Sequence, residues 1–270
     1  MSILDDIMAF KKKEVQQSKE LFPIKLLEQS LYFEGTPVSL KKYLKRPDQA
    51  GIIAEFKRKS PSKGVINKHA KVESTSIGYM QAGASGLSIL TDQKFFGGKA
   101  EDLKTARQFN FCPILRKDFI VDEYQVVEAK SMGADVILLI AACLDTSEIQ
   151  HLSTLAKSLG MEVLLEVHNP SEIQRSLGPN IDIVGVNNRN LKSFETSIDV
   201  SKKLASLIPH DFLKISESGI DNVAAIAELR QYGYQGFLLG EFFMKQGQPA
   251  KACRNFIKEL KGLKEDLVKV

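Results

Sequence analysis

The sequence predicts an α/β protein in which eight parallel strands alternate with helices and close into a (β/α)8 barrel, or TIM barrel. Short apolar segments alternate with longer amphipathic ones over roughly 220 residues after residue 51. Most of the short segments are continuous apolar runs, as in parallel strands that are covered on both faces. Glycines follow the helical segments, where they commonly end a helix: Gly83, Gly133, Gly160, Gly178 and Gly233.

The predicted strands are residues 51–56, 86–90, 113–115, 136–140, 162–166, 183–186, 212–216 and 236–240. The predicted helices are residues 72–82, 101–109, 122–132, 146–159, 170–177, 197–207, 221–232 and 248–261. One strand about every 25 residues favours a closed barrel over an open doubly wound sheet, which is the second interpretation. No GxGxxG motif follows the first strand, and this weakens the dinucleotide-binding form of the open sheet.

A helical extension, residues 1–47, precedes the first strand of what we expect to be a single domain over residues 1–270. Apolar residues at helical spacing form a stripe that must be buried: Ile3, Leu4, Ile7, Met8 and Phe10. Pro23 interrupts the next apolar segment, and a second short helix ends near Pro47. We expect the extension to cap the active-site mouth of the barrel rather than to form a second domain.

Composition excludes several classes of protein. The 270 residues are 43% hydrophobic and 26% charged, which is typical of a globular protein and not of a disordered one. The net charge of +4 is spread along the chain, so we expect a small anionic partner rather than nucleic acid. The chain has no apolar run of membrane-spanning length, and its N-terminus lacks the apolar core of a secretory signal, so a cytoplasmic location is expected.

The three cysteines, Cys112, Cys143 and Cys253, form no CxxC pair and lie in apolar or helical contexts. We therefore expect buried, reduced thiols rather than a zinc site or a disulfide. The sequence does not decide the oligomeric state, for which a monomer is the working expectation.

Polar side chains follow the strands at one end, whereas the residues that lead into the strands are mostly small or apolar. Active sites of such barrels lie at the carboxyl ends of the strands. Glu55 and Lys57 are two apart and face the same side, while Lys117, Glu166 and Glu217 lie at or just after the ends of other strands and converge on the same mouth. Neighbouring cations would lower a lysine pKa and burial would raise a carboxyl pKa, which suits general acid–base catalysis. The alternative is an ion-pair network that only closes the barrel.

A phosphate site is predicted at the last two strand–helix loops, a common arrangement in these barrels. Ser218 and Gly219 follow one strand, and Gly240 and Glu241 follow the next, before a possible short extra helix. Glycines let backbone N–H groups approach phosphate oxygens. Ser60, in the SPSKG segment after the first strand, can close over the same phosphate.

Four apolar side chains lie on or beside the same rim: Phe96, Phe119, Leu138 and Leu191. The two phenylalanines stand in polar loops, where a wall for a flat ligand explains an aromatic ring best. For Leu138, core packing is the alternative.

Eight segments, in order from Gly51 to about Met244, resemble the motif series of the indole-3-glycerol phosphate synthase family: IAEFKRKSPSKG, SILTDQKFFGGKAEDL, PILRKDFIVDEYQ, GADVILLIA, LLEVHN, VGVNNRNL, SESGI and FLLGEFFM. The helical extension is similar to that of the family. The resemblance implies an enzyme of tryptophan biosynthesis that needs no metal or cofactor. It would close the ring of 1-(2-carboxyphenylamino)-1-deoxyribulose 5-phosphate, with loss of CO2 and water, to give indole-3-glycerol phosphate.

The resemblance also implies roles for individual residues. Lys117 would be the general acid that protonates the ketone oxygen, and Glu166 would be its acid–base partner. Glu55 would assist the dehydration or orient the lysines, and Lys57 would pair with the anthranilate carboxylate. The other positions would hold the substrate: Asn187, Arg189 and Glu217 in the polar network, Ser60, Ser218, Gly219, Gly240 and Glu241 at the phosphate, and Phe96, Phe119, Leu138 and Leu191 along the aromatic ring.

The chain departs from the family pattern at four positions, none of them a catalytic candidate: Phe56, Lys59, Glu123 and Phe242. Three other functions stay open on the residues alone. The barrel can be another phosphate-binding sugar isomerase, an aldolase that forms a Schiff base on Lys117, or a non-catalytic anion-binding protein.

Overall fold

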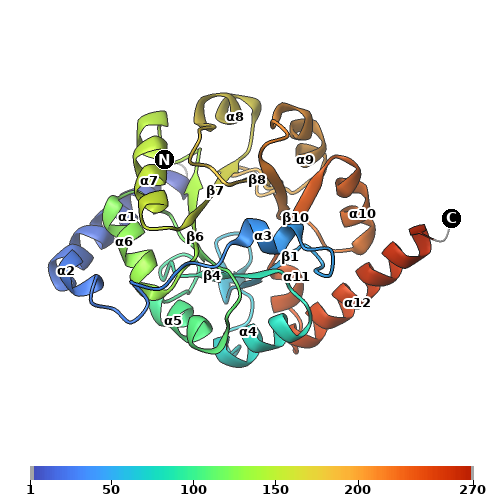
Figure 1. Cartoon of the computed structure of the whole chain (residues 1–270), viewed down its shortest axis with the longest axis horizontal. Helices are drawn as coiled ribbons and strands as arrows, with labels where there is room; N and C mark the ends of the chain where they lie inside the picture. Colours follow the sequence, from blue (N-terminus) through green and yellow to red (C-terminus); the bar gives the residue numbers. More distant parts are fainter. Residues whose placement is uncertain (1–2, 269–270) are drawn as a thin grey trace.

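The structure is a computed structural model that describes residues 3–268, and within this range eight parallel strands close into a barrel (Figure 1). Each strand pairs with the next one in the chain, and the last strand pairs with the first. The strands are β1 (Ile52–Phe56), β4 (Gly86–Leu90), β5 (Ile114–Lys117), β6 (Val136–Ile140), β7 (Glu162–Val167), β8 (Ile183–Asn187), β9 (Leu213–Glu217) and β10 (Tyr234–Leu239). The predicted barrel is confirmed, and the open doubly wound sheet is excluded.

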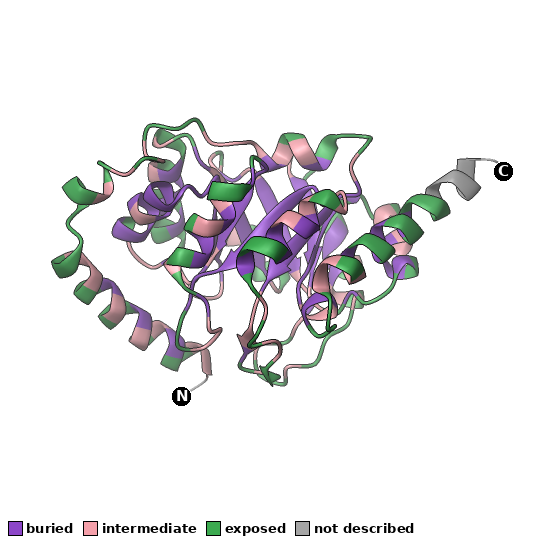
Figure 2. Ribbon diagram, turned by 90° about the horizontal axis from the view of Figure 1, so that it is seen from below, coloured by how far each residue is buried: buried purple, intermediate pink, exposed green. Residues whose placement is uncertain are grey.

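Helices surround the barrel, and their outer faces are exposed while the strands inside are buried (Figure 2). They are α4 (Val72–Gln81), α5 (Ala100–Phe109), α6 (Glu123–Met132), α7 (Thr146–Ser158), α8 (Pro170–Ser176), α9 (Asp199–Leu204), α10 (Val223–Gln231) and α12 (Pro249–Val268). The smaller elements are the hairpin β2 (Lys59–Ser60) and β3 (Gly64–Val65), the 3-10 turn η1 (Ala205–Leu207) and the short helix α11 (Glu241–Met244).

Local chemistry explains where these elements begin and end. The side chain of Asp145 caps α7 and forms a capping box with Glu148. Gly133 ends α6 in the left-handed conformation, with φ of 86°. Strand β10 begins two residues earlier than the predicted start at residue 236, because a register shift between Tyr234 and Gly236 adds an irregular residue to the pairing.

The N-terminal extension is divided between the two ends of the barrel. It consists of α1 (Ile3–Leu21), α2 (Ile24–Leu27) and α3 (Leu40–Lys45), and both α1 and α2 pack on α6. The first turns of α1 lie at the mouth, whereas α3 covers the opposite end and lies across the middle of the ring in Figure 1. The expectation that the whole extension caps the mouth therefore needs correction, because the apolar side chains of α3 fill the end of the barrel where the strands begin.

Two apolar clusters form the core. One lies between the strands and the surrounding helices, and the other fills the inside of the barrel. Leu40 and Leu44 of α3 belong to the inner cluster and contact the barrel at Gly86 and Gly236, near the starts of β4 and β10. A Cβ atom at Gly86 would stand 2.8 Å from Cδ1 of Leu40, and one at Gly236 would stand 2.5 Å from Cγ2 of Ile215 and 3.1 Å from Cδ2 of Leu44. The glycines therefore leave space for α3 and, at Gly236, for the neighbouring strand.

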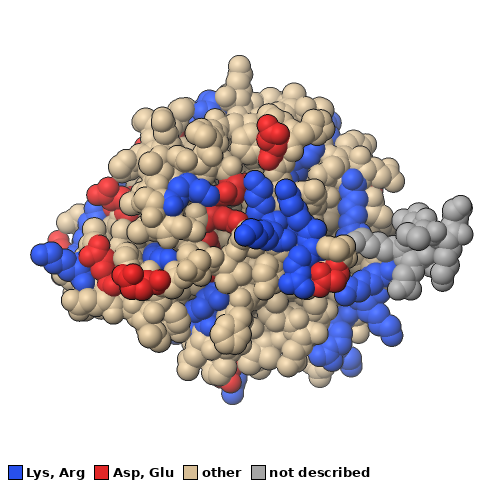
Figure 3. Space-filling model, in the orientation of Figure 1, with Lys and Arg blue, Asp and Glu red and all other residues tan. Residues whose placement is uncertain are grey.

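Lys and Arg side chains gather on the face that α3 covers, as Figure 3 shows. The positive excess of the chain is therefore not confined to the rim that carries the predicted site. Within residues 3–268, no helix is long and apolar enough to cross a membrane.

Leu40→Ala should destabilise the fold without changing substrate affinity. Leu40 is fully buried inside the barrel, and removal of such a side chain lowers the free energy of unfolding by about 2–5 kcal/mol. Urea unfolding gives this value, and steady-state kinetics gives KM. Lys42→Ala, an exposed change in the same helix, is the matched control. A change in KM with no loss of stability would contradict the assignment of α3 to the far end of the barrel.

Candidate active site

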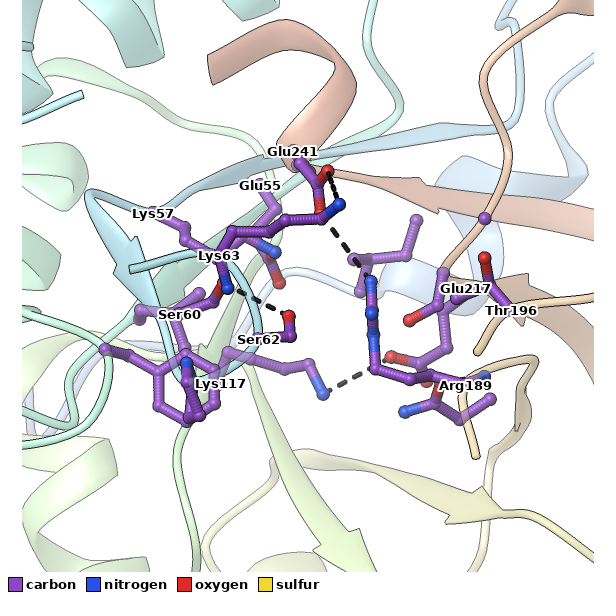
Figure 4. A pocket seen from close by; sticks show the side chains of 18 of the residues that line it. Glu55, Lys57, Ser60, Ser62, Lys63, Lys117, Arg189, Thr196, Glu217 and Glu241 are labelled. Carbon is purple, nitrogen blue, oxygen red and sulfur yellow. Dashed lines mark hydrogen bonds and ion pairs between the residues drawn. The ribbon is translucent and has the colours of Figure 1, made fainter. Parts of the chain in front are cut away.

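A cavity of about 430 Å3 opens at the carboxyl ends of the strands (Figure 4). The residues that the sequence assigns to catalysis and substrate binding all line it: Glu55, Lys57, Ser60, Phe96, Lys117, Phe119, Leu138, Glu166, Asn187, Arg189, Leu191, Glu217, Ser218, Gly219, Gly240 and Glu241. The closed barrel brings them together because the carboxyl ends of parallel strands share one rim.

Lys117 lies at the centre of the polar cluster. It is the last residue of β5, a strand that the sequence predicts to end at residue 115, and its Nζ lies 2.7 Å from Oε2 of Glu166 on β7. The same Nζ lies 3.3 Å from Oε2 of Glu217 on β9. Asn187 donates from Nδ2 to Oε1 of Glu166 over 3.1 Å. Four strands therefore contribute side chains to one buried hydrogen-bonded group.

Glu55 and Lys57 form a second ion pair in the cavity. The Lys57 Nζ lies 2.8 Å from Oε1 of Glu55, and Ser88 donates from Oγ to Oε2 of Glu55 over 3.3 Å. A Cβ atom on Gly240 would stand 2.4 Å from Oε1 of Glu55. The glycine that follows β10 thus allows the Glu55 carboxylate to occupy this place.

Cationic side chains and sharply turned backbone meet at the corner of the cavity formed by the last loops. In Figure 4, Glu241 lies between Arg189 and Lys63, with N–O distances of 3.6 Å and 3.9 Å. Ser218 and Gly219 both adopt left-handed backbone conformations, with φ of 69° and 72°. The left-handed conformation of Ser218 is unusual for a residue with a side chain, and such turns form anion-binding concavities.

Apolar side chains form the remaining walls. The rings of Phe96 and Phe119 are 6.0 Å apart between centroids and are tilted by 40°. Ile3, Leu4 and Ile7 of α1 also line the cavity, a placement that the sequence does not predict residue by residue. The helical stripe signals that these side chains are buried but not what they contact.

Comparison with known proteins identifies the family. A sequence profile of the family described as indole-3-glycerol phosphate synthase matches residues 4–256. The chain belongs to the indole-3-glycerol phosphate synthase family. It is therefore a carboxy-lyase of tryptophan biosynthesis that acts on a phosphorylated, anthranilate-derived substrate, and neither the sugar isomerase nor the aldolase interpretation is supported.

Two relatives show how far the similarity extends. The chain is 46% identical over 258 residues to the indole-3-glycerol phosphate synthase of Bacteroides thetaiotaomicron, an alignment that covers 96% of this chain and 98% of the relative. It is 40% identical over 260 residues to that of Campylobacter fetus, which covers 96% of this chain and 99% of the relative.

Solved structures of low sequence identity share the fold. The 3-hexulose-6-phosphate synthase from Salmonella typhimurium matches with a TM-score of 0.62 and 13% identity, over 78% of this chain and 99% of that one. A chain from the tryptophan synthase complex of Pyrococcus furiosus matches with a TM-score of 0.57 and 14% identity, over 80% of this chain and 99% of that one. At these identities the similarity concerns the barrel alone.

The pKa of Lys117 is raised, contrary to the lowered value expected from the sequence. Burial alone would lower the pKa of this ammonium, but the carboxylates of Glu166 and Glu217 outweigh burial. The prediction was wrong because it assumed cations beside Lys117, whereas the barrel places carboxylates there. Lys117 is therefore held in its ammonium form.

The two carboxyl groups beside Lys117 differ in protonation. Burial would raise the pKa of Glu166, but Lys117 and His168 lower it to about 2, so this group is a carboxylate. Burial raises the pKa of Glu217 to about 7, because repulsion from Glu166 and Glu55 adds to burial and Lys117 offsets only part of it. Oε1 of Glu217 is buried and has no hydrogen-bond partner within residues 3–268.

Two polar residues support this cluster from outside the cavity lining. Nε2 of His168 lies 3.4 Å from Oε1 of Glu166, and Nδ1 lies 3.3 Å from Oε2 of Glu172. Burial would lower the pKa of His168, but the contacts with Glu172 and Glu166 raise it.

The sequence analysis does not select Ser88, which donates a hydrogen bond to Glu55. The signal that could have revealed it is a polar residue inside the apolar run of residues 86–90.

The four departures from the family pattern leave the polar cluster intact. Phe56 is buried beneath the Arg58 guanidinium, 4.6 Å from the ring centroid, and Lys59 donates to the carbonyl of Lys94. Glu123 is the first residue of α6. Phe242 lines the cavity and packs on neighbouring phenylalanines, so it is the one departure that changes the surface facing the substrate.

Gly240→Ala should impair catalysis through Glu55. The new Cβ would overlap the Glu55 carboxylate, and a displacement of about 1 Å in an active site can reduce the rate about 100-fold. We expect a loss of that order in kcat/KM with an unchanged circular dichroism spectrum. Gly247→Ala, where the added Cβ meets nothing within 4 Å, is the control. Equal kcat/KM of the two variants would show that displacement of Glu55 does not lower catalytic activity.

Glu217→Gln should reduce the dependence of stability on pH. The pKa of Glu217 in the fold, about 7, lies above its ordinary value of 4.5. The stabilisation from its protonated form is therefore complete below pH 4.5 and is lost as the pH rises through about 7. The native protein should lose more thermal stability than Glu217→Gln between about pH 5 and about pH 8 when Tm is measured by calorimetry. Parallel curves would show that Glu217 is ionised throughout this range.

Proposed function

We propose that this chain closes the indole ring of 1-(2-carboxyphenylamino)-1-deoxyribulose 5-phosphate, with Lys117 as the general acid. The observation that carries the proposal is the Lys117 ammonium, held 2.7 Å from Glu166 and 3.3 Å from Glu217 inside the cavity. Around it lie the two features that such a substrate needs, aromatic walls and a cationic corner.

The substrate would span the cavity from the cationic corner to the aromatic walls. Its phosphate would bind at Ser218, Gly219 and Gly240, with Ser60 from the β1 side and Arg189 nearby. Arg189 and Lys63 face Glu241 in this structure, so the phosphate would compete with that carboxylate for both cations.

The anthranilate part would lie at the other end of the cavity. Its ring would rest against Phe96 and Phe119, with Leu138 and Leu191 beside it. Its carboxylate would pair with Lys57, replacing or sharing the contact of that ammonium with Glu55. In this orientation the ketone of the sugar chain would lie near Lys117.

Ring closure is the step for which Lys117 is suited. The ring carbon that bears the carboxylate attacks the ketone carbon, and the ring loses aromaticity. A proton from the Lys117 ammonium onto the ketone oxygen would neutralise the charge that develops there. Glu166, ionised and hydrogen-bonded by Asn187, would stabilise the ammonium, and the proton that Lys117 gives up would be replaced from solvent after the step.

Loss of CO2 then restores the aromatic ring, and loss of water completes the indole. The departing hydroxyl needs a proton, and the ring methylene carbon between the hydroxyl-bearing carbon and the nitrogen must lose one, so that the double bond of the indole forms. Glu217, with a pKa of about 7 and an unpartnered buried oxygen, is the carboxyl that can supply a proton at neutral pH. Glu55, which the resemblance assigns either to the dehydration or to orienting the lysines, would orient Lys57 and accept the proton that is lost.

The first turns of α1 would exclude water during these steps. Ile3, Leu4 and Ile7 form an apolar cover at the mouth.

We also propose that the chain acts as a monomer, since a single chain supplies all the site residues. Its proposed location is the cytoplasm, as expected from the sequence. Its three cysteines are free, and burial raises the pKa of each thiol to about 12, so none is an activated thiolate.

A fluorescence assay tests the proposed reaction. Incubation of the purified protein with the carboxyphenylamino-deoxyribulose phosphate should produce indole fluorescence, and the absence of product at micromolar enzyme would overturn the assignment.

Lys117→Ala should lower kcat by about 1,000-fold, within the range known for loss of a general acid, while the fold is kept. Lys104→Ala, an exposed change on α5, is the control. A two- or threefold loss would show that Lys117 is not the acid.

A further inference from the structure

Lys11 of α1 is a buried cation that none of the roles above uses. It is 1% exposed, although it belongs to a helix on the outside of the barrel. Its Nζ lies 2.9 Å from Oδ2 of Asp92 and 3.0 Å from Oδ1 of Asp118. Both acids are buried and follow β4 or β5 closely, so this contact joins the extension to the mouth of the barrel.

The two acids hold the aromatic walls of the cavity. Oδ1 of Asp92 accepts from the backbone N–H groups of Phe95 and Phe96, over 2.7 Å and 3.1 Å. Oδ1 of Asp118 accepts from the backbone N–H of Phe119 over 2.8 Å. The ammonium of Lys11 therefore neutralises the carboxylates that fix the backbone beneath both phenylalanine walls.

The same helix contributes to the cavity directly. Ile7, one turn before Lys11, lines the cavity together with Ile3. The ring of Phe10 packs edge-on against Phe95, with 5.9 Å between centroids. Lys11 thus lies between the part of α1 that covers the mouth and the loop that carries Phe96.

Lys11 and Asp118 both stay ionised in the neutral pH range. Burial would lower the pKa of Lys11, but Asp118 and Asp92 raise it above its ordinary value. Burial would raise the pKa of Asp118, but Lys11 and Arg116 lower it. Removal of the ammonium would leave buried carboxylates short of a counter-ion, and such groups move toward water or protonate.

We propose that Lys11 is a positioning residue, which docks the first helix on Asp92 and Asp118 and so holds Phe96 and Phe119 at the spacing that accepts the anthranilate ring. This inference rests on the substrate placement proposed above. Contacts with the ring are made before and during the reaction alike, so their loss raises KM more than it lowers kcat.

Kinetics of Lys11→Met tests the proposal, because methionine keeps the apolar stem and removes the charge. We expect KM to rise about tenfold while kcat stays within about threefold of native. Lys12→Met, an exposed change next to it in the helix, is the matched control and should match native. Circular dichroism at the assay temperature confirms that each variant is folded. A lower Tm with an unchanged KM would show a purely structural contact and overturn the proposal.

A double-mutant cycle with Phe96→Ala separates positioning from general destabilisation. If Lys11 acts through this wall, Lys11→Met should raise KM less than about threefold in the Phe96→Ala background. Full additivity of the two effects on KM would overturn the proposal.

If Lys11→Met does not fold, Asp92→Asn replaces it. This change weakens the ion pair with Lys11 and keeps an acceptor oxygen for the backbone N–H groups, and it should also raise KM. Inactivity of the native protein would instead count against the proposed function.

Discussion

One ammonium between two buried carboxylates organises the active site of this barrel. Removal of Lys117, Glu166 and Glu217 from water is unfavourable for each charge, and their contacts of 2.7 Å and 3.3 Å offset it only because the strands hold the groups in place. The same contacts separate the two carboxyl pKa values, to about 2 for Glu166 and about 7 for Glu217. The group thereby holds an ammonium, a carboxylate and a carboxyl group that titrates near neutral pH, all from side chains of ordinary chemistry.

The surrounding structure serves to keep this group dry and in position. The N-terminal extension contributes at both ends of the barrel, since α1 supplies apolar cover at the mouth and α3 fills the opposite end with Leu40 and Leu44. Buried ion pairs at Lys11 join the cover to the strand ends. A single segment of chain outside the repeated strand–helix units therefore contacts both the mouth and the opposite end of the barrel.

Much of the fold follows from local patterns. Continuous apolar runs predict buried parallel strands, and the strands at residues 86–90 and 136–140 have the predicted bounds. The predictions were less accurate where pairing decides the boundary, as at Tyr234, whose strand starts before its register shift, and at Lys117, which remains inside its strand. Hydrogen bonds to neighbouring strands set such ends, and these are not encoded in the segment itself.

The sequence by itself determined the barrel, the family and the set of residues at the rim, because strand period, strand order and motif spacing are properties of the chain read along its length. Only the tertiary structure decided which charges meet. Lys117 and Glu166 are 49 residues apart, and their contact, like that of Lys11 with Asp92 and Asp118, depends on barrel closure. The direction of each pKa shift follows from these contacts, because burial and neighbouring charge are properties of three-dimensional position.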